Sequence, residues 1–312
     1  MGLKKESEIG KYESLCFGDI MYKWLEEKQN SIKTSTYSNY LFIIEKYLHP
    51  NFSNYKLKDL VCFNFNDFIR ELMKTLSSKF IRDILCVLKS VLHFAEQEYN
   101  LDLNIKRMSV PKLNSSTLAI FSNKEKHRLE RYCMKNNELR TLGIFICLNT
   151  GLRIGEICAL KWNNVDLDKK VLYVKSTLQR IYDENLNKTK VIIDVPKTSH
   201  SVRAIPISKK LYEILLPLKK LYKPDDFVLS GRSDKFIEPR NFQYNFKITL
   251  KACNIKSYNF HILRHTFATD CIQVGMDVKS LSELLGHANV NITLNRYVHS
   301  SYKIKKKYLE RL

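Results

Sequence analysis

The sequence contains no long hydrophobic run, which excludes a membrane-spanning helix, because such a helix needs roughly 20 consecutive apolar residues. The first ten residues, MGLKKESEIG, lack the apolar core of a secretory signal. The eight cysteines form no C-x-x-C pair, and most lie in apolar runs such as LGIFICL. This pattern favours buried, reduced thiols over disulfides or zinc ligands. Together these absences predict a soluble, cytoplasmic protein.

Acidic residues are few relative to basic ones. The 312 residues include 52 lysines and arginines against 32 aspartates and glutamates, a formal net charge of +20. This excess predicts a polyanionic partner. We favour nucleic acid over an anionic membrane because no basic amphipathic anchor stands out, and a generally basic surface is the plain alternative. The length suits about two domains, and 44% hydrophobic residues are enough to build their cores.

The first hundred residues show helical periodicity and no strand-like alternation. In FGDIMYKWLEEKQ the apolar residues share one face, and STYSNYLFIIEKYLHP offers Ser35 as an N-cap and Pro50 as a helix stop. Further amphipathic segments bring the expected number of helices to four or five. We therefore predict a helical domain at residues 11–104 and a linker at residues 105–120, where Pro111 and several small polar residues occur.

The rest of the chain mixes helices with strands. SNKE at residues 122–125 predicts a helix start with a capping box. The runs KKVLYVKSTLQRI and KVIIDVPKTSHSVRAIPIS, broken by DENLNKTK and KTSHS, predict a three-stranded antiparallel sheet. After it we expect helices up to a basic tail at residues 301–312. The predicted fold is mostly α with a small antiparallel β-sheet, and the second domain is a mixed α+β domain at residues 121–300.

The segment NFHILRHTFATD places His261, Arg264 and His265 on one helix face. Histidines at this spacing can bind zinc, but the metalloprotease pattern requires Glu where Ile262 stands, and an arginine between the ligands would repel the cation. A polar helix face without chemistry is the plain alternative. Because a guanidinium matches phosphate oxygens and an imidazole can donate or exchange a proton, the third interpretation is an anion site.

An anion site needs contributions from other segments. Arg153 follows a glycine turn at a predicted helix start, and Glu156 is spaced to orient it. Lys197 lies between two β-rich runs, from which a long amine can reach into a groove. His287 and Tyr297 lie in LGHANVNITLNRY. Taken singly, each is compatible with an ordinary ion pair, a solvated lysine or a packed aromatic ring.

Five sequence elements occur in a fixed order: GLRIGE, PKTSHSVRAIPI, HILRHTFAT, LGH and NRY. This series resembles the tyrosine recombinase, or phage integrase, family over residues 120–300, and the helical N-terminal segment resembles that family's core-binding domain. The resemblance implies that Tyr297 forms a 3′-phosphotyrosine link with DNA while Arg153 and Arg264 hold the scissile phosphate. The other implied site residues are Lys197 as general acid, His261 in proton transfer and positioning, His287 on the phosphate, and Glu156 and His265 in support.

The implied chemistry needs no energy source, because the covalent intermediate keeps the phosphoester bond energy. The sequence shows neither a glycine-rich phosphate loop nor a carboxylate metal cluster, so we predict a metal-independent and ATP-independent enzyme without cofactors. The implied partners are double-stranded DNA at core-type sites and further copies of the chain, as a tetramer on two sites. An excision factor or a host bending factor would be additional partners. Candidate DNA-contacting residues in the first domain are Lys33, Thr34, Thr36, Tyr37, Asn39, Lys79 and Arg82.

The long insertion QRIYDENLNKTKVIIDVPKTSHS resembles integrases of phages and conjugative transposons more than chromosome-dimer resolvases, which have a short hairpin at that place. This predicts integration and excision of a mobile element. The alternatives are an Xer-like resolvase, a non-catalytic DNA-binding module of the same fold, a type IB topoisomerase and a zinc hydrolase.

Overall fold

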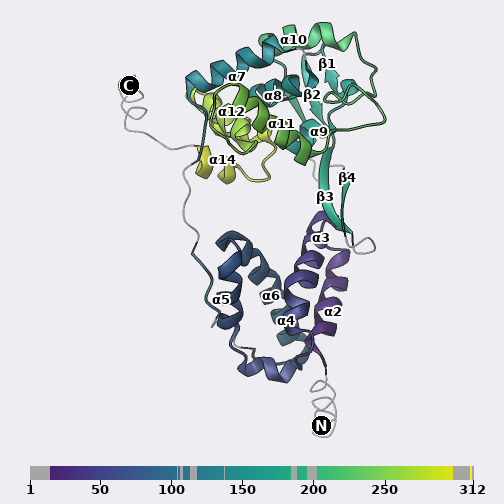
Figure 1. The fold of residues 1–312 in the computed structure, drawn as a ribbon, viewed down its shortest axis with the longest axis vertical. Helices are drawn as coiled ribbons and strands as arrows, with labels where there is room; N and C mark the ends of the chain where they lie inside the picture. Colours follow the sequence, from purple (N-terminus) through teal and green to yellow (C-terminus); the bar gives the residue numbers. More distant parts are fainter. Residues whose placement is uncertain are drawn as a thin grey trace. The chain divides into compact units, whose positions relative to one another are not determined.

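The computed structural model describes residues 15–103, 105, 108–112, 118–136, 138–183, 188–194, 202–297 and 310. The chain forms two compact units (Figure 1), each with its own hydrophobic core. Unit 1 is Met1–Ser116 with Arg180–Lys190, and unit 2 is Thr117–Gln179 with Val191–Leu312. Within the part of the chain that the structure describes, no helix combines the length and apolar character that crossing a membrane requires.

Unit 1 is helical. Its helices pack their apolar faces around a core in which the buried Phe52 ring meets that of Phe68 edge-on, with 4.8 Å between the ring centroids. Residues Arg180–Lys190 belong to this unit, where Tyr182 exchanges hydrogen bonds with Ser38 and packs its ring on Phe42. The elements are α2 (Phe17–Gln29), α3 (Thr34–Ile43), a π-helical turn (Ile44–Leu48), α4 (His49–Phe52), a 3-10 helix (Leu57–Cys62), α5 (Phe65–Thr75) and α6 (Ser78–Tyr99).

Two expected helix boundaries in unit 1 are wrong. Helix α3 begins at Thr34, so Lys33 and not Ser35 occupies the N-cap position, without a side-chain cap bond. Pro50 does not stop the chain from being helical, because the π-helical turn leads directly into α4. Pro50 lies in the first turn of α4, where the missing N–H of proline leaves no intrahelical hydrogen bond unmade.

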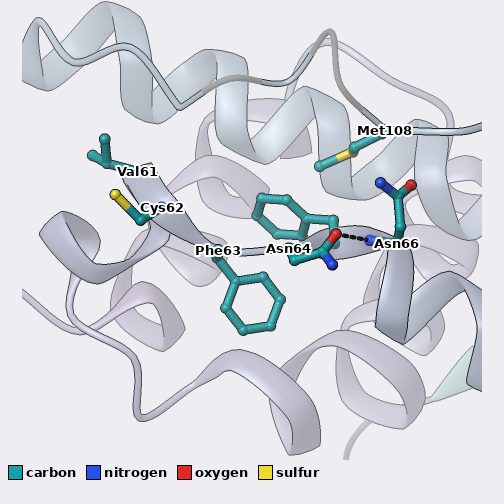
Figure 2. A pocket seen from close by; sticks show the side chains of 7 residues that line it. Val61, Cys62, Phe63, Asn64, Asn66 and Met108 are labelled. Carbon is teal, nitrogen blue, oxygen red and sulfur yellow. Dashed lines mark hydrogen bonds between the residues drawn. The ribbon is translucent and has the colours of Figure 1, made fainter.

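The start of α5 shows a side-chain cap and lies beside a small open cavity. Asn64 Oδ1 accepts a hydrogen bond from the Asn66 N–H at 3.2 Å (Figure 2). The cavity, of about 190 Å³, is lined by Val61, Cys62, Phe63, Asn64, Phe65, Asn66 and Met108. None of these lining residues is charged, so we assign the cavity no part in the chemistry.

Unit 2 surrounds a small sheet with helices, which confirms the predicted mostly α fold with a small antiparallel sheet. Helix α12 packs against α8 and α13, and these three helices carry or flank the residues of interest below. The helices are α7 (Asn123–Lys135), α8 (Leu139–Thr150), α9 (Ile154–Ala159), a 3-10 turn (Trp162–Asn164), α10 (Lys209–Lys219), α11 (Pro239–Ala252), α12 (His261–Gln273), α13 (Val278–Leu285) and α14 (Val290–Tyr297).

The strands form one three-stranded sheet and one two-stranded ribbon. The sheet has the order β1 (Val165–Asp166), β2 (Val171–Val174) and β5 (Arg203–Pro206), with both neighbours antiparallel to β2. Strands β3 (Thr177–Asp183) and β4 (Lys188–Asp194) pair only with each other in the described residues. The first β-rich run is therefore split at residues 175–176 into two strands that join different sheets.

A capping box and two left-handed glycines set the ends of helices in unit 2. The predicted capping box is present, since Ser122 and Glu125 exchange side-chain and backbone hydrogen bonds at the start of α7. Helices α8 and α13 both end in a left-handed glycine, Gly151 with φ +67° and Gly286 with φ +64°. A Cβ on Gly286 would come within 3.0 Å of an Arg203 nitrogen, so a side chain there would disturb a buried guanidinium.

Candidate active site

Arg264 of α12 links the ends of two other helices. Its Nη1 donates to the Gly151 carbonyl at 2.9 Å, and its Nη2 donates to the Leu285 carbonyl at 2.7 Å. Nη2 also meets His287 Nε2 at 2.9 Å. The residue is only 3% exposed. These three bonds leave N–H groups of the guanidinium available for the Tyr297 hydroxyl or for a bound anion.

Arg153 occupies the N-cap position of α9, and Glu156 holds it there. Arg153 Nη1 donates to Glu156 Oε1 at 2.8 Å, while the Arg153 backbone N–H donates to Glu156 Oε2 at 2.8 Å. Its Nη2 donates to the Gly286 carbonyl at 3.0 Å. The carboxylate thus fixes both the backbone and the side chain of Arg153, as the spacing of GLRIGE suggests.

Arg203, at the start of β5, is a member of the cluster that sequence reasoning missed. Its Nη1 and Nη2 donate to the two carboxylate oxygens of Glu156 at 2.9 and 2.8 Å, and its Nε donates to the Leu284 carbonyl at 2.6 Å. A signal was present in VRAIPI, because strand alternation puts Arg203 on the same buried face as Ile205. A cation on a core face needs a buried carboxylate, which Glu156 supplies.

The last three residues before His287 are held by three arginines. The carbonyls of Leu284, Leu285 and Gly286 accept hydrogen bonds from Arg203, Arg264 and Arg153, respectively. The end of a helix leaves its last carbonyls without intrahelical partners and carries partial negative charge, so guanidinium groups are favourable there. The end of α13 therefore organises the cationic cluster and fixes the turn that carries His287.

The cluster carries more positive than negative charge. Burial would raise the pKa of Glu156, but the hydrogen bonds and charge of Arg203, aided by Arg153, outweigh it and hold the pKa at about 2. One carboxylate therefore faces three guanidinium groups. Burial, and after it the charge of Arg153, lowers the pKa of Arg264, although an arginine stays protonated in proteins. An anion bound beside Arg153 and Arg264 would relieve this repulsion.

His287 has a defined tautomer. Arginine can only donate, so His287 Nε2 accepts from Arg264, and the imidazole proton lies on Nδ1, which donates to Thr293 Oγ1 at 2.7 Å. Burial, followed by the charges of Arg264 and Arg153, lowers the pKa of His287 to about 4, so the ring is neutral at physiological pH. Its ring lies parallel to that of Tyr297, with 6.4 Å between the centroids.

Tyr297, the last residue of α14, is buried beside this cluster. It is 6% exposed and packs with Ala268, Leu281 and Leu285. Its hydroxyl lies 2.9 Å from His265 Nδ1. Burial raises the pKa of Tyr297, while the charges of Arg264 and Arg296 act in the opposite direction. The structure thus brings Tyr297, His265, His287 and Arg264 together within one chain.

Two candidate catalytic residues, His261 and Lys197, take no part in the hydrogen bonds described above. His261 opens α12 with an exposed side chain, and its ring centroid is 5.9 Å from that of His265. Lys197 lies outside the described residues. Within the described ranges, no group of three or more histidine, cysteine, aspartate or glutamate side chains is arranged to hold a metal ion.

The candidate DNA-contacting residues of unit 1 gather on two elements. Lys33 to Asn39 lie at and after the start of α3, while Lys79 and Arg82 lie in the first turns of α6. Five of the seven, Lys33, Thr34, Asn39, Lys79 and Arg82, are exposed, and Thr36 and Tyr37 are half-buried. The exposed ones are accessible to a phosphate backbone.

Replacing Arg203 with methionine is expected to lower the free energy of unfolding by about 3 kcal/mol, because it leaves the buried Glu156 carboxylate with one partner. Replacing Glu156 with methionine as well should restore most of that stability, since an apolar pair of similar volume can substitute for a buried ion pair. Denaturant unfolding of the two variants measures both effects. Equal stability of the single variant and the unchanged protein would contradict the buried contact.

The DNA-free protein is expected to lose stability as the pH falls from 6.5 to 4. His265 and His287 have pKa values of about 4 in the folded chain against 6.5 ordinarily, each lowered by burial and then by neighbouring cations. In this window the unfolded chain binds more protons, so stability rises with pH. Thermal unfolding between pH 4.5 and 7.5 measures the slope, which His265→Asn should reduce. The same slope in that variant would contradict a neutral, buried His265.

Comparison with known proteins gives two family matches. Residues 114–303 match the model of the phage integrase family, and residues 16–73 match that of the phage integrase N-terminal SAM-like domain. The first match alone covers more than half of the chain, so it carries the family assignment.

Individual relatives agree with these matches. A protein named tyrosine recombinase XerC-like from Caldanaerobacter subterraneus subsp. tengcongensis is 29% identical, covering 96% of this chain and 83% of the relative. The ICEBs1 integrase of Bacillus subtilis is 24% identical, covering 99% and 85%. Among solved structures, the Tn1549 transposon integrase in complex with circular intermediate DNA aligns with a TM-score of 0.75 at 22% identity, covering 95% of this chain and 99% of that one. This last likeness concerns the fold.

Proposed function

Because the chain belongs to the phage integrase family of tyrosine recombinases, we propose that it integrates and excises a mobile DNA element by cutting and rejoining DNA at core-type sites. The family membership confirms the resemblance found in the sequence, and the chain is a DNA strand-transfer enzyme. We propose in addition the roles of individual residues, the DNA-binding surface and the mobile-element role. It is supported chiefly by the contact of the Tyr297 hydroxyl with a histidine beside a buried, cationic arginine cluster.

In the proposed reaction, Arg153 and Arg264 bind the scissile phosphate through N–H groups that their structural contacts leave available. Tyr297 Oη attacks the phosphorus, the bond from phosphorus to the 5′ oxygen breaks, and a 3′-phosphotyrosine link forms. Negative charge grows on the phosphoryl oxygens during attack, and preorganised guanidinium groups stabilise it. Lys197 protonates the departing 5′ oxygen, which is otherwise a poor leaving group.

The reverse step rejoins the DNA. A 5′ hydroxyl attacks the phosphotyrosine, which retains the energy of the original phosphodiester, so rejoining needs no ATP. Two guanidinium groups supply the charge that a metal ion provides in many phosphoryl-transfer enzymes. We expect adduct formation to continue in EDTA.

The DNA-binding surface in this proposal includes α3 and the first turns of α6. Lys33, Lys79 and Arg82 neutralise backbone phosphates, so binding weakens as the salt concentration rises. Further copies of the chain complete a tetramer on two sites in the cytoplasm, and an excision factor or a host bending factor sets the direction of recombination.

Two named relatives lead to competing biological roles. The name of the ICEBs1 integrase fits a mobile element, as does the long β-rich insertion that forms β3 and β4. The name XerC-like on the other relative fits a chromosome-dimer resolvase. We favour the mobile element because the insertion is long.

The DNA that flanks the gene distinguishes the two roles. The unchanged protein is expected to recombine two duplexes made from the ends of the element that carries its gene. Footprinting with the Tyr297→Phe protein, which is held before cleavage, locates the bound sites on these ends. Recombination between two directly repeated copies of one chromosomal site, with no footprint on the element ends, would support the resolvase and contradict the mobile-element role.

A further inference from the structure

The tyrosine that attacks the phosphate must lose its proton, and the structure shows which side chain lies within hydrogen-bonding distance of its hydroxyl. Tyr297 on α14 and His265 on α12 lie 32 residues apart, yet Tyr297 Oη is 2.9 Å from His265 Nδ1. Both residues are buried, with exposures of 6% and 9%. A phenol is a weak nucleophile until its proton leaves, so the group that accepts this proton contributes directly to the rate.

The protonation states of the two residues decide which one donates the hydrogen bond. Burial comes first among the effects that lower the pKa of His265 to about 4, and the charges of Arg296, His261 and Arg264 add to it. The imidazole is therefore neutral at physiological pH. Tyr297 keeps its proton because burial raises its pKa. The phenol thus donates to a lone pair on Nδ1, and the imidazole proton lies on Nε2.

His287, the other histidine beside the phenol, is unsuited to receive the proton. Its Nε2 lone pair accepts from Arg264, and its Nδ1 proton goes to Thr293. Protonating Nε2 would set an imidazolium against a guanidinium at 2.9 Å. Among the described side chains, His265 is the one that holds a lone pair toward Tyr297 Oη.

We propose that His265 is the general base of the cleavage reaction, a role that rests on the proposed function. As the bond from Tyr297 Oη to phosphorus forms, the phenolic proton passes to His265 Nδ1. The bond to the 5′ oxygen breaks, and that oxygen takes its proton from the general acid, the role given to Lys197. During rejoining, His265 returns its proton to Oη as the phosphotyrosine bond breaks.

The surrounding cations make this base dependent on substrate. In the DNA-free protein, Arg264 and His261 of α12 and Arg296 of α14 disfavour an imidazolium at position 265. A phosphodiester bound to the guanidinium groups neutralises part of that charge. The basicity of His265 therefore rises when DNA is bound, and Tyr297 stays protonated and unreactive without it.

The matched variants separate the base from a simple positioning contact. In His265→Asn, the amide oxygen occupies nearly the place of Nδ1, so it accepts the hydrogen bond of Tyr297 but cannot hold a proton. His265→Phe removes both properties. We expect His265→Asn to bind the suicide duplex normally and to form adduct on the order of 100-fold more slowly at neutral pH.

A sulfur substrate isolates the nucleophilic step. When sulfur replaces the scissile 5′ bridging oxygen, the leaving group departs without an acid, so Lys197→Ala should regain its rate. His265→Asn should stay slow on this substrate. Its rate should also climb by about tenfold per pH unit where the unchanged enzyme levels off, because hydroxide must replace the base.

Three outcomes decide the matter. If His265→Asn forms adduct at the normal rate with the normal pH profile while His265→Phe is slow, the residue only positions Tyr297 and the proposal is overturned. Recovery of His265→Asn on the sulfur substrate would also overturn it. Should His265→Asn fail to fold, rescue of His265→Ala by added imidazole is the deciding readout, with no rescue counting against the base. Failure of the proposed function is distinct, since the unchanged protein would then form no adduct through Tyr297.

Discussion

Replacing Tyr297 with phenylalanine is expected to abolish the covalent protein–DNA adduct and to leave DNA binding unchanged. The phenylalanine ring can occupy the same buried position against Leu281 and Leu285, because these packing contacts are apolar. What is lost is the hydroxyl, with its hydrogen bond to His265. A suicide duplex that traps the cleaved complex, resolved on a denaturing gel, measures the adduct.

Tyr258 provides a matched control. It is half-buried in unit 2, where its ring packs edge-on against Phe121 at 5.4 Å between centroids. Tyr258→Phe therefore removes the same hydroxyl group from another tyrosine of unit 2 and should form adduct at the normal rate. An adduct that persists in Tyr297→Phe would contradict the assignment of the nucleophile.

Replacing Arg264 with glutamine is expected to slow adduct formation by roughly 100- to 1,000-fold, the usual effect of losing one preorganised donor to a developing oxyanion. The Arg264→Lys variant should form adduct nearly as slowly. The guanidinium spans two carbonyls through separate nitrogens, Gly151 through Nη1 and Leu285 through Nη2, while still facing a ligand. One ammonium group cannot reproduce that fork. Single-turnover cleavage at saturating protein measures the chemical step apart from binding.

Two controls accompany the Arg264 variants. Arg232→Lys alters an exposed arginine paired with Asp234 and should be neutral. Mixing Arg264→Gln with Tyr297→Phe tests whether one chain supplies both groups, because Tyr297 lies beside Arg264 of its own chain. We expect the mixture to form adduct no faster than the Arg264→Gln protein alone. Recovery of cleavage in the mixture would show that the tyrosine is delivered to a partner's arginines.

Much of the secondary structure of unit 2 follows from local sequence. Ser122 and Glu125 predict the start of α7, and Gly151 predicts the end of α8. Both predictions work because caps and left-handed glycines depend on residues close together in sequence. Ser35 and Pro50 gave wrong helix boundaries, because α3 begins one residue before Ser35 and the chain is helical on both sides of Pro50. Each residue type is a common cap or stop signal, but such a signal permits a helix boundary without fixing it.

The contacts of the candidate site depend on tertiary structure and could not be read from spacing. Arg203 and Glu156 lie 47 residues apart, and no periodicity links a strand residue to a helix N-terminus. The contact between His265 and Tyr297 spans 32 residues. Family resemblance predicts which residues form the site. Only the three-dimensional structure shows which imidazole nitrogen faces the phenol.

Mass spectrometry of the trapped adduct is the most direct test of the central role of Tyr297. After nuclease and protease digestion, we predict that the peptide ending α14 carries a nucleotide through a 3′ phosphate on the Tyr297 phenolic oxygen. A modified residue elsewhere in the chain, or cleaved DNA with no protein attached, would contradict the role of Tyr297.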